Sequence, residues 1–203
     1  MKKVVLFLAV FLLMTAGVFS HFLSGFDAKI YEAAKTLAVP GWLAFNKKIT
    51  FFGDSFFIYP AGAILALLVA LKGKAREGLF FYASFLLGTG FDYSLKILFD
   101  RIRPVFFDPS MVLLSPAYPS GHAFGAVVFY LLAVRLFSKN RFICGAAFFW
   151  ALMIGASRIF LGVHWATDVF GGIFLGLAWV FSCNLPWGKS PLPPFSKGGN
   201  SGL

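Results

Sequence analysis

Charged residues are scarce in this sequence, and acidic residues are the scarcest of them. Only 8 of its 203 residues are Asp or Glu, against 18 Lys or Arg, and the four types together make up 13% of the chain. A typical soluble domain has about 25% charged residues. An ordinary soluble globule, a coiled coil and a disordered chain are therefore excluded. The two cysteines, Cys144 and Cys183, form no spacing motif and indicate no redox compartment.

Apolar residues dominate instead, at 59% of the chain with 19% aromatic. They form runs of about the 20 residues that a helix needs to cross a bilayer. The runs are continuous and do not alternate with polar residues, which favours helices over strands. We predict an all-α polytopic membrane protein, a bundle of six transmembrane helices. The predicted spans are 4–19, 56–71, 79–99, 121–137, 142–159 and 165–183.

The remaining segments are short, so we expect residues 1–185 to form a single transmembrane domain. Within it, residues 20–55 have mixed polarity, and the helical spacing of apolar residues over 26–38 predicts a short helix along the membrane interface. The tail, 186–203, holds four prolines and several glycines and is predicted to be disordered. Residues 1–19 also resemble a signal peptide, but Ala16-Gly17-Val18 is a poor cleavage site, which favours a retained first helix.

The distribution of positive charge predicts an orientation. With the N-terminus in the cytoplasm, 10 of the 18 cations and one acid, Glu77, fall on the inner side. This asymmetry fits the positive-inside rule and six spans, with both termini cytoplasmic. The inner cations are Lys2, Lys3, Lys72, Lys74, Arg76, Arg135, Lys139, Arg141, Lys189 and Lys197.

Three polar clusters interrupt the apolar chain, all on the predicted outer side. Polar side chains near spans are costly and usually functional, and two of the three histidines lie in these clusters. The clusters are Lys96 to Arg103-Pro104, then Pro119-Ser120-Gly121-His122, then Ser157-Arg158 followed by His164 and Asp168.

Three cations of these clusters are expected to converge. Lys96 and Arg103 are seven residues apart, which predicts one shared helix face, with Pro104 ending that helix. Arg158 closes the fifth predicted span. Their joint presence favours a phosphate site, because guanidinium groups match phosphate oxygens. The alternative for any one of them is snorkelling to lipid headgroups.

The second cluster opens a predicted helix. Ser120 is placed as its N-cap, and Gly121 allows the backbone to be approached closely. Free N–H groups and the helix dipole make such a helix start an anion site, and His122 stands in its first turn. A plain cap and a packed interfacial histidine are the alternatives.

His164 and Asp168 are four residues apart and share a helix face. The carboxylate can accept from one ring nitrogen and leave the other free as a nucleophile. A simple helix-end hydrogen bond is the alternative. Two histidines and an aspartate could also bind zinc, but the three cations would repel a dication, so we expect neither a metal nor any other cofactor.

The motifs K-x6-R-P, P-S-G-H and S-R-x5-H-x3-D match, in order and spacing, the signature of the type 2 phosphatidic acid phosphatase (PAP2) family. This family resembles the soluble vanadium-dependent haloperoxidases in its site alone. The resemblance implies that His164 attacks phosphorus to form a phosphohistidine, that Asp168 orients it, and that His122 protonates the leaving oxygen and then activates water. It also implies a set of phosphate-binding residues, Lys96, Arg103, Ser120, Gly121 and Arg158.

We therefore expect a metal-independent phosphatase acting on a lipid phosphate or diphosphate at the outer face of a bacterial inner membrane. Undecaprenyl diphosphate, phosphatidylglycerophosphate, phosphatidate and a lipid A phosphate are the candidate substrates. Its partners would be this substrate and membrane lipids, not nucleic acid, and the oligomeric state stays open. The alternatives are a phosphotransferase with a non-water acceptor and a transporter or scaffold. Outside the signature, we predict that Asp92 pairs with Lys96 on one helix face. Arg101, at a variable position of K-x6-R-P, could be a substrate contact or a surface charge, and we favour a surface charge.

Overall fold

The computed structural model describes residues 1–108, 113–138 and 140–183, and in these ranges it is all helical, with eight helices and no strand. Residues 109–112 and the predicted disordered tail, 186–203, lie outside the described residues. The helices are α1 (Lys2–Phe19), α2 (Ser24–Thr36), α3 (Pro40–Phe51), α4 (Ser55–Leu71), α5 (Ala75–Phe99), α6 (Gly121–Phe137), α7 (Arg141–Phe160) and α8 (Ala166–Ser182).

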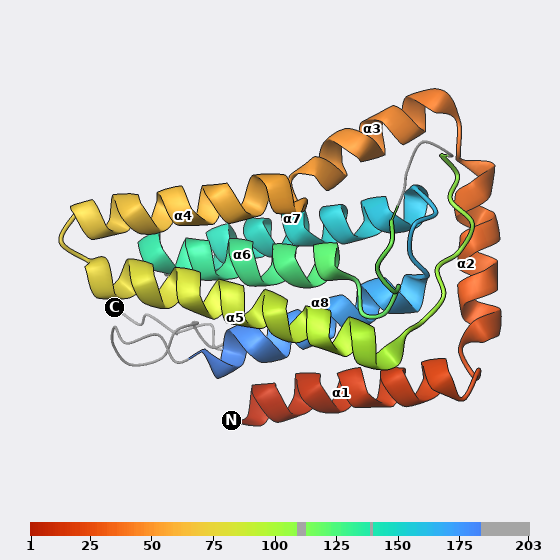
Figure 1. Ribbon diagram of the computed structural model, residues 1–203, viewed down its shortest axis with the longest axis horizontal. Helices are drawn as coiled ribbons and strands as arrows, with labels where there is room; N and C mark the ends of the chain where they lie inside the picture. Colours follow the sequence, from red (N-terminus) through yellow and green to blue (C-terminus); the bar gives the residue numbers. More distant parts are fainter. Residues whose placement is uncertain (109–112, 139, 184–203) are drawn as a thin grey trace, which may run out of the picture.

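Six helices, α1 and α4 to α8, run along the long axis of the molecule with alternating direction, and α2 lies across one end (Figure 1). The most extensive packing joins α6 to α8 and to α7, and α1 to α8. The end of α5, the start of α6 and the turn between α7 and α8 all point toward the end of the bundle where α2 lies (Figure 1). This arrangement brings the three polar clusters to one end of the bundle.

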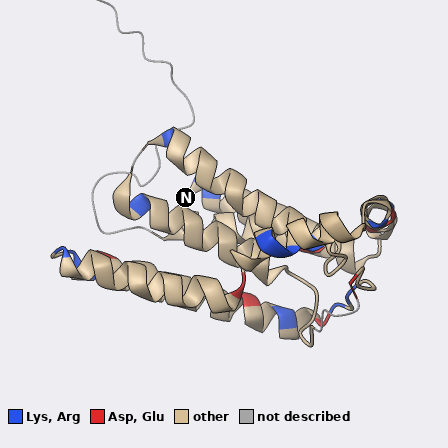
Figure 2. Cartoon of the chain, turned by 90° about the horizontal axis from the view of Figure 1, so that it is seen from above, with Lys and Arg blue, Asp and Glu red and all other residues tan. Residues whose placement is uncertain are grey.

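The described helices are those of a membrane protein. Three apolar segments are long enough to cross a bilayer by length and composition, namely Lys2–Phe19, Arg141–Phe160 and the stretch Pro40–Leu71, which contains α3 and α4. Two shorter apolar helices, α6 and α8, have 17 residues each. Figure 2 shows long stretches of helix that carry no charged residue. The charged residues lie mostly toward the two ends of the bundle.

Close packing of α8 on α6 depends on two glycines. A Cβ on Gly172 would lie 2.5 Å from the carbonyl oxygen of Ser120, and one on Gly176 would lie 3.0 Å from Cβ of Val127. Small residues allow helices to approach this closely in lipid. The contact fixes the start of α6 against the first turns of α8.

One helix was not predicted, and one local expectation is wrong. The unpredicted helix, α3, forms over 40–51, with Pro40 in its first turn where a missing N–H costs nothing. In addition, α5 ends at Phe99, because Asp100 takes the left-handed conformation, with φ 41°. Arg103 therefore follows the helix and does not share a helix face with Lys96.

Candidate active site

A pocket of about 610 Å³ lies at the end of the bundle where the polar clusters meet. Six of the eight predicted site residues line it, and Ser120 and Asp168 do not. Both are fully buried, at 0% exposure, behind the pocket wall. The six lining residues are Lys96, Arg103, Gly121, His122, Arg158 and His164.

His164 lies between a carboxylate and a guanidinium group. Its Nδ1 is 3.3 Å from Oδ2 of Asp168, and its Nε2 is 3.0 Å from Nη1 of Arg103. Because a guanidinium group can only donate, Nε2 accepts and the proton of a neutral imidazole stands on Nδ1. Burial, together with the nearby positive charges of Arg103 and Lys96, holds the pKa of His164 well below its usual range. The imidazole is therefore a neutral base with its lone pair on the pocket side.

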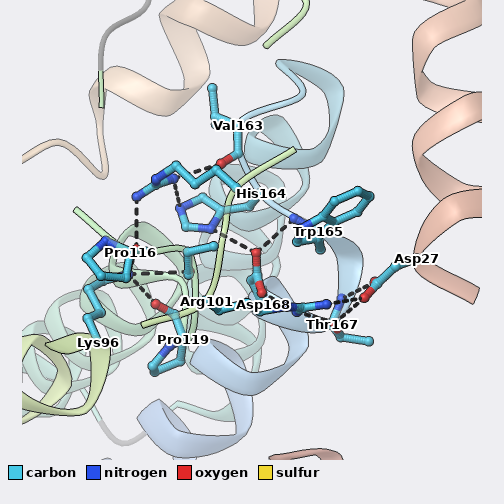
Figure 3. Close-up of polar contacts among 12 residues, drawn as sticks. Asp27, Lys96, Arg101, Pro116, Pro119, Val163, His164, Trp165, Thr167 and Asp168 are labelled. Atoms are coloured by element: carbon cyan, nitrogen blue, oxygen red, sulfur yellow. Dashed lines mark hydrogen bonds and ion pairs between the residues drawn. The ribbon is translucent and has the colours of Figure 1, made fainter. Parts of the chain in front are cut away.

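Asp168 holds this part of the site together. Its Oδ2 also accepts from the backbone N–H of Trp165 at 2.8 Å, and its own carbonyl oxygen accepts from the N–H of Ser120 at 2.9 Å. The first bond fixes the turn that carries His164, beside Asp168 in Figure 3. The second joins the second and third polar clusters through the backbone.

Arg103 reaches the pocket from the segment that follows α5. Its Nε donates to the carbonyl oxygen of Ser115 at 2.7 Å, and its Nη1 donates to that of Val163, also at 2.7 Å. Its Nη2 donates to the hydroxyl of Ser115 at 3.1 Å and to the carbonyl oxygen of Pro116 at 3.2 Å. Backbone carbonyl oxygens from two segments, the one before α6 and the one that carries His164, thus position the guanidinium group.

Lys96 is buried at 6% exposure near the end of α5. Its ammonium group donates to the carbonyl oxygens of Pro116, at 3.3 Å, and of Pro119. The predicted pair with Asp92 is absent from the described ion pairs, and Oδ1 of Asp92 is buried without a hydrogen-bond partner. The segment before α6 offers Lys96 carbonyl oxygens, which take its hydrogen bonds, while Asp92 lies near enough to interact with it electrostatically.

Arg158 lies at the end of α7 with 2% exposure. Its Nη1 donates to the hydroxyl of Thr50 at 2.7 Å, and its Nε has no hydrogen-bond partner in the part of the chain that the structure describes. Thr50 is buried on α3, the helix that the sequence did not predict. The role of α3 is thus to bring a hydroxyl against the third cation.

Ser120 occupies the N-cap position of α6, as predicted, but its side chain makes no capping hydrogen bond. Its Oγ is buried and has no partner among the described residues. Gly121, next in the chain, is closely approached by side chains: an added Cβ would lie 3.1 Å from Oδ2 of Asp92 and 3.3 Å from Cε of Lys96. A side chain at position 121 would therefore displace Lys96.

His122, in the first turn of α6, has different neighbours from His164. Its Nε2 is buried without a hydrogen-bond partner and lies 3.7 Å from Oδ2 of Asp54. Asp54 is the N-cap of α4 and accepts from the N–H of Phe56 at 2.9 Å. The contact with His122 holds the pKa of Asp54 below its usual value, although partial burial opposes this. The second histidine thus has a carboxylate neighbour of its own.

Arg101 is not the surface charge that the sequence suggested. Its side chain is only 16% exposed and lies between Asp168 and Asp27 of α2 (Figure 3). Sequence reasoning missed Asp27 altogether. The one available signal is that Asp27 and Ala34, seven residues apart, fall on one face of α2, the face that is buried.

No group of three or more His, Cys, Asp or Glu side chains in the described ranges is placed to hold a metal ion. The pocket instead combines a neutral imidazole, a second histidine and three cations at a helix start. Such a set can bind a phosphoryl group and place a nucleophile against phosphorus.

Comparisons with known proteins agree with this geometry. A sequence model of the PAP2 superfamily matches residues 77–189. The chain is 32% identical to phosphatidylglycerophosphatase B of Bacillus subtilis, over 89% of this chain and 92% of that protein. It is also 32% identical to an undecaprenyl-diphosphatase of Sulfolobus acidocaldarius, over 58% of each chain.

Solved structures show the same fold. A transmembrane PAP2-type phosphatidylglycerolphosphate phosphatase from Bacillus subtilis superposes with a TM-score of 0.84 at 29% identity, over 90% of this chain and 94% of that one. Aquifex aeolicus LpxE superposes with a TM-score of 0.63 at 21% identity, over 77% and 93%. With the family model, the relative of nearly equal length and the three polar motifs in agreement, the chain belongs to the PAP2 superfamily.

Proposed function

We propose that this protein is an integral membrane phosphatase that hydrolyses a lipid phosphate or diphosphate through a phosphohistidine intermediate. The observation that carries the proposal is the pair of hydrogen-bond partners that hold the two ring nitrogens of His164. Its Nδ1 proton faces Asp168 and its Nε2 lone pair faces Arg103, in a pocket that two further cations line. The names of the relatives, a phosphatidylglycerophosphatase and an undecaprenyl-diphosphatase, support a lipid phosphate as substrate.

In the first step, Nε2 of His164 attacks phosphorus and the bond from phosphorus to the lipid oxygen breaks. Arg103 transfers its hydrogen bond from Nε2 to a phosphoryl oxygen, which frees the lone pair. His122 gives its proton to the leaving lipid oxygen. Phosphoryl transfer depends mainly on positioning and charge stabilisation. Positioning and charge stabilisation would come from Lys96, Arg158 and the start of α6 at Ser120 and Gly121.

In the second step, His122 takes a proton from water as the water oxygen attacks phosphorus. The bond from phosphorus to Nε2 breaks and inorganic phosphate is released. Asp168 keeps the proton on Nδ1 throughout and stabilises the positive charge that His164 carries in the intermediate. No step in this scheme requires a metal ion.

The pocket wall fits a lipid. Apolar side chains of α4 and α5 line it beside the cations, among them Phe56, Ile58 and Leu86. Phe56 is 91% exposed, which is expected of a side chain that faces hydrocarbon. We infer that the phosphate enters between the cations while the lipid chain lies along α4 and α5.

We further propose six membrane spans, α1 and α4 to α8, in one domain over residues 1–185, with α2 and α3 at the membrane interface. The alternating direction of the six helices supports this count (Figure 1). The three shortest spans, α4, α6 and α8, have 17 residues each and are at the lower end of the range of about 17–25. The positive-inside distribution of Lys and Arg supports an orientation with both termini in the cytoplasm of a bacterium and the pocket on the outer side of its inner membrane.

Phosphate release from detergent-solubilised protein tests the proposal. We expect wild type to release inorganic phosphate from at least one of phosphatidylglycerophosphate, undecaprenyl diphosphate, phosphatidate and a lipid A phosphate, under identical detergent conditions. His164→Ala should release none. The matched control is His21→Asn, because His21 is exposed and has a φ of 60°, which Asn tolerates.

Activity should persist in excess EDTA, because cations of the protein itself neutralise the phosphoryl charge. Loss of activity in EDTA that Mg²⁺ or Zn²⁺ restores would contradict the metal-free scheme. Release by His164→Ala at the wild-type rate would contradict the nucleophile, and no release from any lipid phosphate by wild type would contradict the function itself.

A further inference from the structure

Two residues that are not signature positions of the three motifs, Arg101 and Asp27, surround Asp168. Arg101 donates through Nη1 to Oδ1 of Asp168 and, at 2.8 Å, to the hydroxyl of Thr167, and through Nη2 to Oδ2 of Asp27 at 2.7 Å. Asp27, on α2, is 2% exposed. Figure 3 shows the guanidinium group between the two carboxylates. The catalytic carboxylate is therefore connected to a helix that lies across the end of the bundle.

The two oxygens of Asp168 have different partners. Oδ2 accepts from Nδ1 of His164 and from the N–H of Trp165, whereas Oδ1 accepts from Arg101. Arg101 thus fixes the rotation of the carboxylate that presents Oδ2 to His164. Without it, nothing among the described contacts engages Oδ1.

Asp27 holds the first turn of α8 in place. Its Oδ1 accepts from the N–H of Thr167 at 2.9 Å, and its Oδ2 accepts from the hydroxyl of Thr167 at 2.6 Å. The first N–H groups of a helix need such acceptors, and Trp165, the N-cap residue, has no side-chain oxygen to offer. A carboxylate from α2 supplies the cap and so positions the residue next to Asp168.

The charges of Asp27, Arg101 and Asp168 explain why Arg101 and Asp27 affect the site. Two buried carboxylates, Asp27 and Asp168, share one guanidinium group, so removing Arg101 leaves two negative charges close together with little solvent. A buried charge without its partner is strongly unfavourable. The carboxylates then turn apart or take up a proton, and either change weakens the hold of Asp168 on His164.

We propose that Arg101 and Asp27 are positioning residues, which act through Asp168 to hold the imidazole of His164 with its Nε2 lone pair toward the pocket. This inference rests on the proposed function, because it assigns the two residues to the step in which His164 attacks phosphorus. Neither residue lines the pocket. Their effect should therefore appear in the rate of that step and not in the binding of the phosphate.

The test is the single-turnover rate of phosphoenzyme formation with p-nitrophenyl phosphate, which reports the attack of His164 directly. We expect Arg101→Met to lower this rate by about 10- to 100-fold, as when the outer partner of a metal-bound histidine is lost. KM should change little. Arg101→Lys should recover part of the rate, because an ammonium group restores the charge but cannot bridge both carboxylates. Asp27→Asn, which keeps its shape, should lower the rate in the same way.

Background and control variants separate positioning from a purely structural role. In Asp168→Asn protein, Arg101→Met should have little further effect on the residual rate, because Arg101 acts through Asp168. The controls Arg76→Met and Glu32→Gln, at exposed positions on α5 and α2, should behave as wild type. Thermal unfolding in detergent shows which variants are folded. If Arg101→Met does not fold, the test is made with Asp27→Asn.

Three results would overturn the inference. They are a wild-type rate in folded Arg101→Met or Asp27→Asn, a rise in KM with an unchanged rate, and a loss of equal size with and without Asp168. A wild-type protein that forms no phosphoenzyme would be a different result, because it would contradict the proposed function before any variant is compared.

Discussion

His122 and His164 differ in what surrounds them. The imidazole of His164 is held between Asp168 and Arg103, whereas Nε2 of His122 is 3.7 Å from Asp54. The first arrangement suits a nucleophile and the second a proton donor and acceptor. Replacing each histidine should therefore cause a different loss of activity.

With p-nitrophenyl phosphate, whose leaving group needs little protonation, His122→Ala should still give a burst of p-nitrophenol followed by slow turnover. With a lipid phosphate, whose leaving oxygen is strongly basic, the same variant should lose about 10²–10⁴-fold, the usual contribution of general acid–base catalysis. His164→Ala should give neither burst nor turnover. A burst from His164→Ala and none from His122→Ala would exchange the two roles.

The low pKa of His164 predicts a pH dependence. Burial and the neighbouring cations lower this pKa, so the neutral, nucleophilic form persists as the pH falls through 6.5, the ordinary histidine value. It is lost only when the pH passes the lower value in the folded protein. The single-turnover rate of phosphoenzyme formation should thus show no fall centred near pH 6.5, and a fall centred there would show that His164 titrates as an exposed histidine.

At the residue scale, the sequence predicted the groups that touch the pocket better than those behind it. The spacing of charged residues near apolar runs identifies Lys96, Arg103, Arg158 and His164, because such residues are costly in a span unless they have a function. Asp27 lies in a segment of mixed polarity, where a charge is ordinary, and Arg101 occupies a variable position of the first polar cluster. The two residues are 74 positions apart in the sequence, and only the fold shows that their side chains are in contact.

At the scale of the elements, the six long helices begin and end within a few residues of the predicted spans. Continuous apolar runs between charged residues determine such helices almost completely. α3 was missed because its sequence, PGWLAFNKKITF, mixes apolar and basic residues without a clear period and follows a proline. The predicted span ends at Phe99 as α5 does, but the expected continuation of the helix to Arg103 was wrong, because the left-handed conformation of Asp100 ends it and no apolar pattern reveals that.

The α6–α8 contact predicts a difference between two glycines. Gly172→Ala places a Cβ about 2.5 Å from the carbonyl oxygen of Ser120, so α8 must move away from α6. We expect a loss of about 1–3 kcal/mol in stability, the usual effect of overpacking, and a loss of activity as the start of α6 shifts. Thermal unfolding and phosphate release in detergent measure both.

Gly145→Ala is the matched control, because a Cβ at this position on α7 would meet nothing within 4 Å. It should be neutral or slightly stabilising, since alanine favours a helix over glycine. Equal unfolding temperatures for the two variants would show that the close approach of α8 to α6 does not contribute to stability.

For the whole molecule, the orientation in the membrane decides which lipids the pocket meets. Leu114, which is 96% exposed, lies in the segment before α6, and Lys74 lies between α4 and α5 at the opposite end of the bundle. In a background with Cys144 and Cys183 replaced by alanine, Leu114→Cys should react with a membrane-impermeant thiol reagent in intact spheroplasts. Lys74→Cys should react only after lysis.

The reverse labelling pattern would place the pocket in the cytoplasm and change the available substrates. The sequence supports the outer location through its cations alone, of which the inner side holds ten. Neither the fold nor the site depends on that orientation, because the same bundle can form whichever way it is inserted.

Lys96, Arg103 and Arg158 all donate hydrogen bonds to acceptors of the protein itself. A phosphate group that binds as proposed would have to compete with these acceptors, so it would bind by exchanging partners and gain less free energy than it would from unengaged cations. Inorganic phosphate, the final product, should consequently leave readily and inhibit weakly. Vanadate, which imitates the five-coordinate geometry at which the exchange is most complete, should inhibit at far lower concentrations. The same hydrogen bonds that hold the cations in place would thus set the pace of turnover.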